Sequence, residues 1–405
     1  MSDWQHVSAG KIVRQRREIV RLKPGAEYRT MGVRWYGKGA YNRGVVTTET
    51  VKAKSLYRAR EGDFTFNRID TQKGAFAVVP AELDGALATN EFPLYEVNEE
   101  EVDARYLLLN FQRSEVLRQI GAMRAGSEGR ARWKEADFEA WMVPVPPLPV
   151  QRRIVEVIGA VDDQIAALDT EVEATTALRA RLLTEFLTTS QGEEWEKVRL
   201  SDVSFPLTGP AFKASAFAST PVGPRLLRGI NLGRFGTRWK DADTVFWPDE
   251  ESRAFQKYVL EPGDVCIAMD RPFTSDRVLR CGLIKNADLP ALLVQRVIRL
   301  RANPNRVIPE FLILVVQSPG MAERLAGRQT PGGYAPHISG RDISEFTFAL
   351  PPLSVQERIA EVIGAVDAKI TAARAEADRL RSVRAGLLSG LLNRTIDIDS
   401  AELEG

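Results

Sequence analysis

Two stretches of this 405-residue chain gather side chains that can hydrogen-bond to bases and phosphates. The first reads GVRWYGKGAYNR from position 32, and the second reads RGINLGRFGTRWK from position 228. An arginine can bond guanine through two hydrogen bonds, an asparagine can do the same with adenine, and a lysine can bind phosphate. The candidate contacts in these stretches are Arg34, Tyr36, Lys38, Asn42 and Arg43, then Arg228, Asn231, Arg234 and Arg238. The alternative for each one is a fold-supporting or solvated side chain.

Further cations follow a Gly-Asp pair in each half of the chain. The pair at 62–63 precedes an alternating apolar strand, and so does the pair at 263–264. Each half also ends in a basic loop that contains glycine, at 126–134 and 327–339. The candidates from these segments are Arg68, Lys73, Arg271 and Tyr334.

The charge is balanced overall but unevenly distributed. The formal net charge is +1, yet residues 11–73 hold sixteen Lys or Arg against six Asp or Glu, a local balance of +10. Residues 82–105 hold eight acids and one base, and residues 212–240 hold six bases and no acid. Cationic patches attract polyanions because neutralised phosphates release counterions. Charge alone leaves a solvated surface as an equal alternative.

Catalytic and cofactor motifs are largely missing. The glycines and Lys38 resemble a phosphate-binding loop, but Gly39 stands where a magnesium-binding Ser or Thr is required. The two histidines, His6 and His337, exclude an HExxH zinc site and disfavour a histidine-based triad. No Asn or Asp precedes either Pro-Pro pair, so the signature of amino-methyltransferases is missing, as is a glycine-rich cofactor fingerprint. We therefore expect a chain that reads a ligand, is not an enzyme and holds no cofactor or metal.

The remaining composition favours a cytoplasmic protein. The two cysteines, Cys266 and Cys281, have neither the number of a disulfide framework nor the spacing of a zinc site. The apolar run FLILVV at 311–316 is too short to span a bilayer, and the first residues lack the apolar block of a secretory signal. We expect a soluble chain with two incidental thiols in a reducing compartment.

One segment of the chain occurs twice. Residues 146–183 and 351–388 align without a gap at an offset of 205, with 21 identities in 38 positions. Apolar residues recur at alternating intervals of three and four, including Val157 and Leu178 in the first copy and Val362 and Val383 in the second. This spacing predicts two helices of about 38 residues, roughly 57 Å long, that pair along a continuous apolar seam.

The closest approach of the two helices is expected at small residues, which are Gly159, Ala160, Gly364 and Ala365. Two unrelated core helices are the alternative, and the shared length and phase disfavour it. Fainter echoes extend the repeat, such as Trp4-Gln5-His6-Val7 against Trp195-Glu196-Lys197-Val198.

The organisation that follows is a pseudo-duplicated α+β chain. We expect two mixed α/β domains at 1–145 and 191–350, two long helices at 146–190 and 351–394, and a tail at 395–405.

Two divergent domains, each followed by Pro-Pro-Leu-x-x-Gln-x-Arg-Ile and a long helix, resemble the specificity subunit of type I restriction-modification systems. The resemblance covers nearly the whole chain and is most specific in the two repeats. One departure is visible, because Val150-Gln151 and Val355-Gln356 stand where the family usually has Glu-Gln.

This resemblance implies two target-recognition domains, each reading half of a bipartite site in double-stranded DNA, held apart by an antiparallel pair of helices. It implies that two methyltransferase subunits dock on the helices and adjacent domain faces, and that a translocating nuclease subunit joins some complexes. S-adenosylmethionine, ATP and magnesium would then be bound by those partners. An internal duplication would supply two docking surfaces from one chain.

Two other classes stay open at this point. A coiled-coil scaffold for protein assembly fits the balanced net charge, and the steep salt dependence of DNA binding would separate it from a DNA reader. A self-sufficient nuclease or nucleotide hydrolase is disfavoured by the missing motifs and would show turnover by the purified chain.

Overall fold

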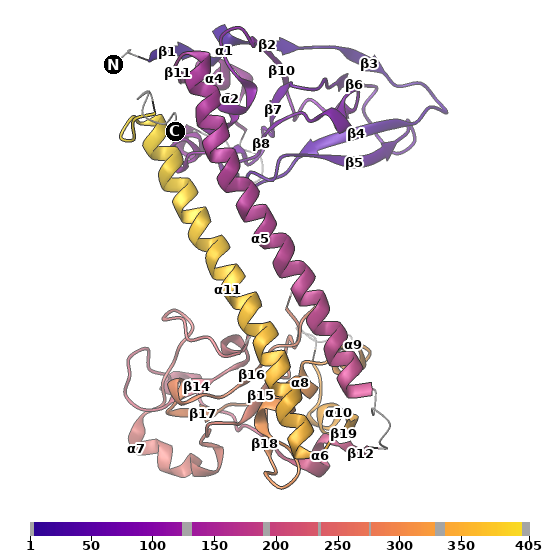
Figure 1. Ribbon diagram of the computed structural model, residues 1–405, viewed down its shortest axis with the longest axis vertical. Coiled ribbons are helices and arrows are strands. Elements are labelled where there is room, and N and C mark those ends of the chain that lie inside the picture. The colour runs from indigo at the N-terminus through magenta and orange to yellow at the C-terminus, as the bar shows by residue number, and fades with distance from the viewer. Residues whose placement is uncertain are drawn as a thin grey trace. The chain divides into compact units, whose positions relative to one another are not determined.

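The computed structural model describes residues 4–123, 132–188, 195–233, 236–274, 277–328 and 337–398, and divides the chain into two compact units. Unit 1 contains residues 1–169 and 375–405, and unit 2 contains residues 170–374. The boundaries fall inside the two long helices, so each unit includes one half of each helix (Figure 1). The expected fold class is confirmed in this respect: two mixed α/β units are connected by long helices.

Unit 1 begins with a mixed α/β domain. Its strands are β1 (Gln5–Ser8), β2 (Val13–Arg16), β3 (Ile19–Arg21), β4 (Tyr28–Val33), β5 (Ala40–Val46), β6 (Ser55–Arg58), β7 (Phe64–Phe66), β8 (Phe76–Val78), β9 (Leu87–Ala88), β10 (Leu94–Val97) and β11 (Met142–Val145). Its helices are α1 (Ala9–Ile12), α2 (Ala104–Phe111), α3 (Ser114–Met123), α4 (Glu135–Glu139), the first half of α5 (Leu148–Thr188) and the second half of α11 (Leu353–Leu392).

Unit 2 repeats much of this order. Its strands are β12 (Glu196–Arg199), β13 (Ser204–Thr208), β14 (Arg225–Leu227), β15 (Val265–Ala268), β16 (Cys281–Leu283), β17 (Ala291–Leu293), β18 (Val297–Ala302) and β19 (Thr347–Leu350). Its helices are the second half of α5, α6 (Leu200–Val203), α7 (Asp249–Ser252), α8 (Pro309–Val316), α9 (Pro319–Ala326), α10 (Gly340–Ser344) and the first half of α11 (Leu353–Leu392).

The two units share a framework of sheets. The strand order β2-β10-β7-β8 in unit 1 matches β13-β18-β15-β16 in unit 2, and all pairings in both sheets are antiparallel. The pairs β1-β11 and β12-β19 also correspond, so the faint echo between the two tryptophan segments marks equivalent strands. From α2 onward the equivalence is an offset of 205, since α2, α3 and α4 begin at 104, 114 and 135 and α8, α9 and α10 begin at 309, 319 and 340.

The units differ in what is inserted into that framework. Between β2 and β10, unit 1 builds a five-stranded sheet of order β3-β6-β9-β4-β5. Between β13 and β18, unit 2 has a two-stranded parallel pair, β14-β17, and long irregular segments. The same scaffold therefore carries two dissimilar inserts.

The cores of the two units also differ in composition. Unit 1 is centred on packed rings, with Phe76 and Phe111 centroids 5.0 Å apart and Trp133 and Phe138 fully buried. The equivalent core of unit 2 is mostly aliphatic and includes the buried helix α8. Burial of such side chains stabilises a fold by about 1.5–3 kcal/mol each. The apolar run at 311–316 belongs to that core helix.

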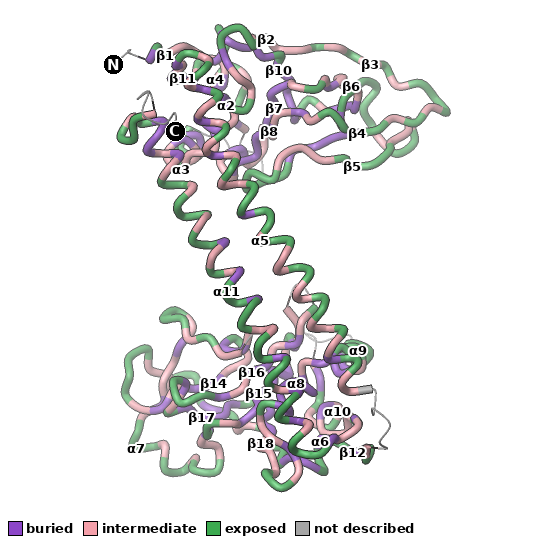
Figure 2. The backbone as a smooth tube through the Cα atoms, in the orientation of Figure 1, coloured by how far each residue is buried: buried purple, intermediate pink, exposed green. Residues whose placement is uncertain are grey.

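The long helices are anchored by their ends. Ile154 and Ile158 of α5 join the core of unit 1, and their equivalents at offset 205, Ile359 and Ile363 of α11, join the core of unit 2. Figure 2 shows exposed and half-buried residues alternating along both helices where they leave those cores. The apolar stripe of each helix therefore joins a domain core near the helix ends. Between those ends, fewer residues of the stripe are buried.

The expected seam is partly wrong. Leu178, Val362 and Val383 are 47%, 45% and 50% exposed, because the buried stripe passes through Ile363 and Leu388 and turns these positions outward. The expected close approach at Gly159 and Gly364 is also wrong, since an added Cβ at either glycine would meet no atom within 4 Å. Ala160 and Ala365 are exposed as well.

A polar cluster ties each helix pair to its domain. In unit 1, Arg384 Nη2 of α11 donates to Asp162 Oδ2 of α5 at 2.8 Å and to Gln112 Oε1 at 2.7 Å. In unit 2, Arg179 Nη2 of α5 donates to Asp367 Oδ2 of α11 at 3.0 Å and to Gln317 Oε1 at 2.6 Å. The three members of each cluster differ by 205 in number, so the duplicated chain makes the same contact twice. These contacts place α5 and α11 side by side and antiparallel within each unit.

A buried glutamine fixes the start of each long helix. The Gln151 side chain accepts from Asp103 N at 2.9 Å and donates to the carbonyls of Glu101 and Pro146 at 2.9 and 2.8 Å. Gln356 makes the equivalent three bonds with the backbone before α8 and α11. Both glutamines are fully buried, so each amide satisfies backbone groups that water does not reach.

We expect Gln151→Ala to lower the free energy of unfolding by about 2–4 kcal/mol, because it leaves buried backbone donors and acceptors without partners. Urea denaturation of the full chain measures the change. Gln164→Ala, at an exposed position of the same helix, is the matched control. Equal midpoint shifts in the two variants would show that the buried amide is not needed.

Candidate functional site

The β4–β5 hairpin of unit 1 carries most of the candidates from the first cationic stretch. Its turn uses positive φ angles at Tyr36, Gly37 and Gly39, of 61°, 68° and 71°. Tyr36 N donates to Lys73 O at 2.7 Å, and Gly37 N donates to Gly74 O at 3.0 Å. These two bonds hold the hairpin tip against the turn that follows β7.

Side-chain contacts strengthen that junction. Lys73 Nζ lies 4.3 Å from the centroid of the Trp35 ring and 3.0 Å from Asp70 Oδ2. The Arg34 guanidinium stacks over Tyr41 at 4.6 Å, a cation–π contact that orients it. The structure thus brings Arg34, Tyr36 and Lys73 onto one surface, where Tyr36 is 72% exposed.

The other unit 1 candidates lie on or near the same hairpin. Lys38, Asn42 and Arg43 are exposed, although Asn42 Oδ1 accepts from Gly44 N at 2.8 Å. The Arg43 guanidinium lies 5.9 Å from the Phe92 ring. Arg68 is different: its side chain is 20% exposed and is paired with Glu135 at 3.4 Å, so it supports the fold.

In unit 2, internal hydrogen bonds fix part of the second cationic stretch. Asn231 is fully buried, and its Oδ1 accepts from Arg228 N at 3.1 Å. Arg228 Nη2 donates to Asp243 O at 2.5 Å, and Arg238 Nε donates to Ile230 O at 3.2 Å. These contacts engage Arg228 and Asn231 within the domain, so both side chains support the fold of unit 2. Arg238 remains exposed.

A buried carboxylate holds this stretch in place. Asp288 Oδ1 accepts from Thr237 Oγ1 at 2.6 Å and from Trp239 Nε1 at 2.8 Å, and its other oxygen accepts from Lys285 N at 2.8 Å. The Trp239 indole N–H therefore anchors the segment, and the Arg225 guanidinium lies 5.2 Å from the centroid of the Trp239 ring.

A different cationic surface of unit 2 surrounds the turn between β15 and β16. Arg271, Arg277 and Arg296 are exposed and have positive φ angles of 44°, 60° and 63°. Asp270 pairs with Arg296 and lies 2.6 Å from His337 Nδ1. Non-glycine residues rarely adopt this conformation, and it is often found at functional sites.

Sequence reasoning identified Arg271 in this group and missed Arg277, Arg296 and His337. The sequence could have indicated these residues only through their position in turns between apolar strands. Their backbone conformation and the pairing with Asp270 depend on the fold. The β15–β16 turn is equivalent to the β7–β8 turn that holds Lys73, so both units carry cations at the same place in the framework. Two candidates, Arg234 and Tyr334, lie outside the described residues, as does most of the loop at 126–134.

The acidic residues of the Gly-Asp pairs close turns. Asp63 Oδ2 accepts from Arg60 N at 2.9 Å, and Asp264 Oδ2 accepts from Glu261 N at 2.8 Å. Each also pairs with an arginine, Arg16 or Arg301, at 2.9 and 2.7 Å. Burial raises the pKa of the Asp63 carboxyl, and the bonds from Arg60 and Arg16 oppose that rise.

Other groups that might do chemistry are enclosed. Burial raises the pKa of Cys266 well above its usual value and that of Cys281 to about 12, so both thiols are protonated at neutral pH. Among the described residues, no three His, Cys, Asp or Glu side chains are grouped to hold a metal ion. No helix in the described part of the chain is long and apolar enough to cross a membrane.

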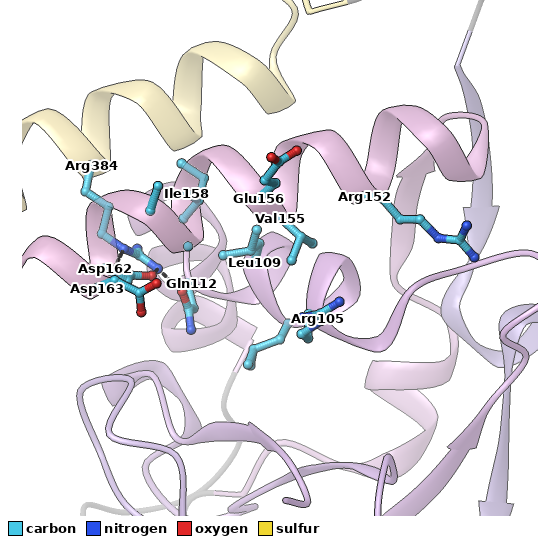
Figure 3. A pocket seen from close by; sticks show the side chains of 13 residues that line it. Arg105, Leu109, Gln112, Arg152, Val155, Glu156, Ile158, Asp162, Asp163 and Arg384 are labelled. Atoms are coloured by element: carbon cyan, nitrogen blue, oxygen red, sulfur yellow. Dashed lines mark hydrogen bonds and ion pairs between the residues drawn. The ribbon is translucent and has the colours of Figure 1, made fainter. Parts of the chain in front are cut away.

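Unit 1 also has a groove of about 670 Å³ between α2 and the first half of α5 (Figure 3). The bonded Asp162 and Arg384 lie at one end of it, and Arg152 lies at the other. Gly159 and Ala160 line this groove, so the small residues hollow the surface beside α2.

Comparison with known proteins finds one family twice along the chain. The model described as type I restriction modification DNA specificity domain matches residues 1–174 and 192–380. The specificity subunit of the type I restriction enzyme EcoAI from Escherichia coli is 36% identical over 167 residues, which are 41% of this chain and 27% of that relative. The MjaVIII specificity subunit from Methanocaldococcus jannaschii is 24% identical over 275 residues, 64% of this chain and 63% of that relative.

The matched stretches therefore span less than two thirds of either curated relative. Among solved structures, one from work on complex assembly and conformational transition of the type I R-M system is 18% identical. It covers 97% of this chain and 98% of its own, with a TM-score of 0.60. This likeness concerns the fold.

We expect Asp288→Ala to expose the segment 236–240 to trypsin at Arg238 and Lys240. Loss of charge-assisted hydrogen bonds costs about 2 kcal/mol, which raises the local opening and the cleavage rate by at least roughly tenfold. Asp241→Ala, at an exposed position nearby, is the control. Cleavage no faster than in that control would rule out Asp288 as the anchor.

Proposed function

Because the chain belongs to the family of type I restriction modification DNA specificity domains, we propose that it is the DNA-specificity subunit of a type I restriction-modification complex. Each unit reads one half of a bipartite site in double-stranded DNA. The chain itself catalyses no reaction and acts with DNA in the cytoplasm. A protein scaffold without DNA reading is the disfavoured alternative.

The observation that carries this proposal is one framework with two different inserts. Strand order is the same in both units, while the segments between the matched strands form a five-stranded sheet in one and a short parallel pair in the other. A shared framework supports equivalent orientations toward a duplex, and different inserts support different base sequences. Repetition with divergence is what an asymmetric two-part site requires.

In unit 1, we place the DNA contacts on the β4–β5 hairpin and the adjoining turn. The exposed Arg34, Tyr36, Lys38 and Arg43 surround a tip that is fixed by Lys73. Hydrogen bonds from arginine to base edges specify sequence, and lysine contacts with phosphate set position. A tip held by backbone bonds loses little freedom on binding.

In unit 2, the proposed contacts are Arg271, Arg277, Arg296 and Arg238. The first three surround the β15–β16 turn and are exposed, and Asp270 orients Arg296 and His337. The buried Asn231 and the internally bonded Arg228 are structural in this account.

The partners belong to the proposal as well. Two methyltransferase subunits dock on the helices and adjacent domain faces, and restriction subunits join some complexes. S-adenosylmethionine, ATP and magnesium are bound by those partners. The duplicated Arg-Asp-Gln clusters support this account because they give each unit the same helix geometry.

The test is to co-express the chain with the methyltransferase encoded beside it and to map methylated adenines across the host genome by long-read sequencing. We expect one split motif with two defined halves around a fixed unspecified spacer. A stable complex with an active methyltransferase but no new methylated motif would favour the scaffold.

We expect Arg34→Ala with Lys38→Ala to weaken binding of the complex to its site and to reduce the slope of log affinity against log salt by up to about two, one for each lost phosphate contact. Lys11→Ala with Arg14→Ala removes one lysine and one arginine from exposed positions away from the hairpin and is the control. An identical salt dependence in both double variants would move the contact surface elsewhere.

The helices are proposed to set the spacer. One heptad adds about 10 Å, or roughly three base pairs, if it is inserted between Ile165 and Arg179 of α5 and also between Ile370 and Arg384 of α11. Both insertions are needed to keep the two Arg-Asp-Gln clusters in register. We expect a longer spacer with both half-sites unchanged in the methylation map. An active variant with the original spacer would exclude this role.

A further inference from the structure

The groove beside α5 in unit 1 combines an apolar floor with charged edges. Leu108 of α2 and Val155 and Ile158 of α5 line the floor, together with the open Gly159 and Ala160. Arg105 and Arg152 are exposed at its edges (Figure 3). Arg105 has an ion pair with Asp103 at 3.6 Å, and its side chain remains 70% exposed.

Three residues of this floor are repeated in unit 2, whereas Leu108 and Val155 correspond to Ile313 and Ala360. At offset 205, Ile158, Gly159 and Ala160 become Ile363, Gly364 and Ala365, with identical residue types. The equivalence is spatial as well, because Gln317, Asp367 and Arg179 bond to each other as Gln112, Asp162 and Arg384 do. Both units therefore present the same apolar strip beside the same polar cluster.

The charges around the strip are not repeated. Arg105 corresponds to Glu310 and Arg152 corresponds to Glu357, and all four residues are exposed. The groove-lining residues of unit 1 comprise three cations, Arg105, Arg152 and Arg384, and three anions, Glu156, Asp162 and Asp163, for a balance of zero. The equivalent positions of unit 2 hold one cation, Arg179, and four anions, Glu310, Glu357, Glu361 and Asp367, for a balance of −3.

We propose that the two surfaces bind the same partner unequally, and that the unit 1 groove takes a helix whose apolar residues are flanked by carboxylates. This inference rests on the proposed function, in which two identical methyltransferase subunits dock on the duplicated helices. The carboxylates approach Arg105 and Arg152 in unit 1, whereas in unit 2 they meet Glu310 and Glu357. Like charges brought together at an interface oppose binding.

Unequal sites have a consequence for assembly. The first partner subunit binds unit 1, and a complex with one partner accumulates before the second subunit occupies unit 2. Salt screens charges at the edge of an interface, so the difference between the two steps narrows as ionic strength rises. Internal duplication thus supplies two docking surfaces while the rim charges determine their order.

The experiment titrates the full chain with the purified methyltransferase subunit and follows species with one and two partners by native mass spectrometry. Two double variants exchange the rim charges: Arg105→Glu with Arg152→Glu, and Glu310→Arg with Glu357→Arg. The control is Arg118→Glu with Arg379→Glu, which makes the same charge change at exposed residues of unit 1 outside the groove lining. Thermal unfolding checks that each variant is folded.

We expect the first binding step to weaken about tenfold in the unit 1 variant, since two favourable rim interactions become repulsive. In the unit 2 variant, the second step should strengthen until the one-partner species accumulates only to the extent that two equal, independent sites require. The control should resemble the wild type.

Two steps in the wild-type chain that differ only by the statistical factor of two equal sites would overturn the inference and leave the proposed function standing, provided that the complex still methylates a split motif. A stronger first step in the unit 1 variant, or a weaker second step in the unit 2 variant, would exclude a partner helix flanked by carboxylates. Failure of the methyltransferase to bind at all would count against both the inference and the proposed function.

Discussion

The structure depends on one constraint: a helix of about 40 residues with one apolar stripe cannot bury that stripe without other elements packed against it. The α5 helix has 41 residues and α11 has 40, and each buries its stripe partly against the other helix and partly in a domain core. The Arg-Asp-Gln clusters fix how the helices meet within each unit. Because their members recur at an offset of 205, the same local solution is used twice.

That solution leaves the inserts free to diverge. The buried glutamines and the four-stranded sheets hold the framework, so the chain between framework strands can change without affecting the helix anchors. Unit 1 uses the freedom to build a hairpin that is pinned to a neighbouring turn. Unit 2 instead exposes arginines around one turn and fixes part of its other cationic stretch through the bonds of Thr237 and Trp239 to Asp288. Equivalent scaffolds thereby present different surfaces.

The two duplicated surfaces beside the long helices are not equivalent in charge. The apolar floor beside α5 and its counterpart in unit 2 are nearly identical in sequence, while their exposed edges carry opposite charges. Within the floor, Ile158 and Ile363 are fully buried and constrained by packing on every side, whereas Gly159, Ala160 and their counterparts are open. Exposed charges are free of that constraint, and they can distinguish two surfaces that share one core.

The repeat, the two long helices and the mixed α/β organisation could be derived from the sequence, because periodicity and duplication are properties of residue order. The family was indicated by the resemblance of the two repeats to those of known specificity subunits. The cationic hairpin of unit 1 was also predictable, since polar residues around glycines favour an exposed turn. Burial of Asn231, exposure of Leu178 and Val383, and the open surroundings of Gly159 were decided by tertiary structure. Residue type and spacing do not reveal which side of a helix faces a neighbour, or whether a polar group finds its partner inside the protein.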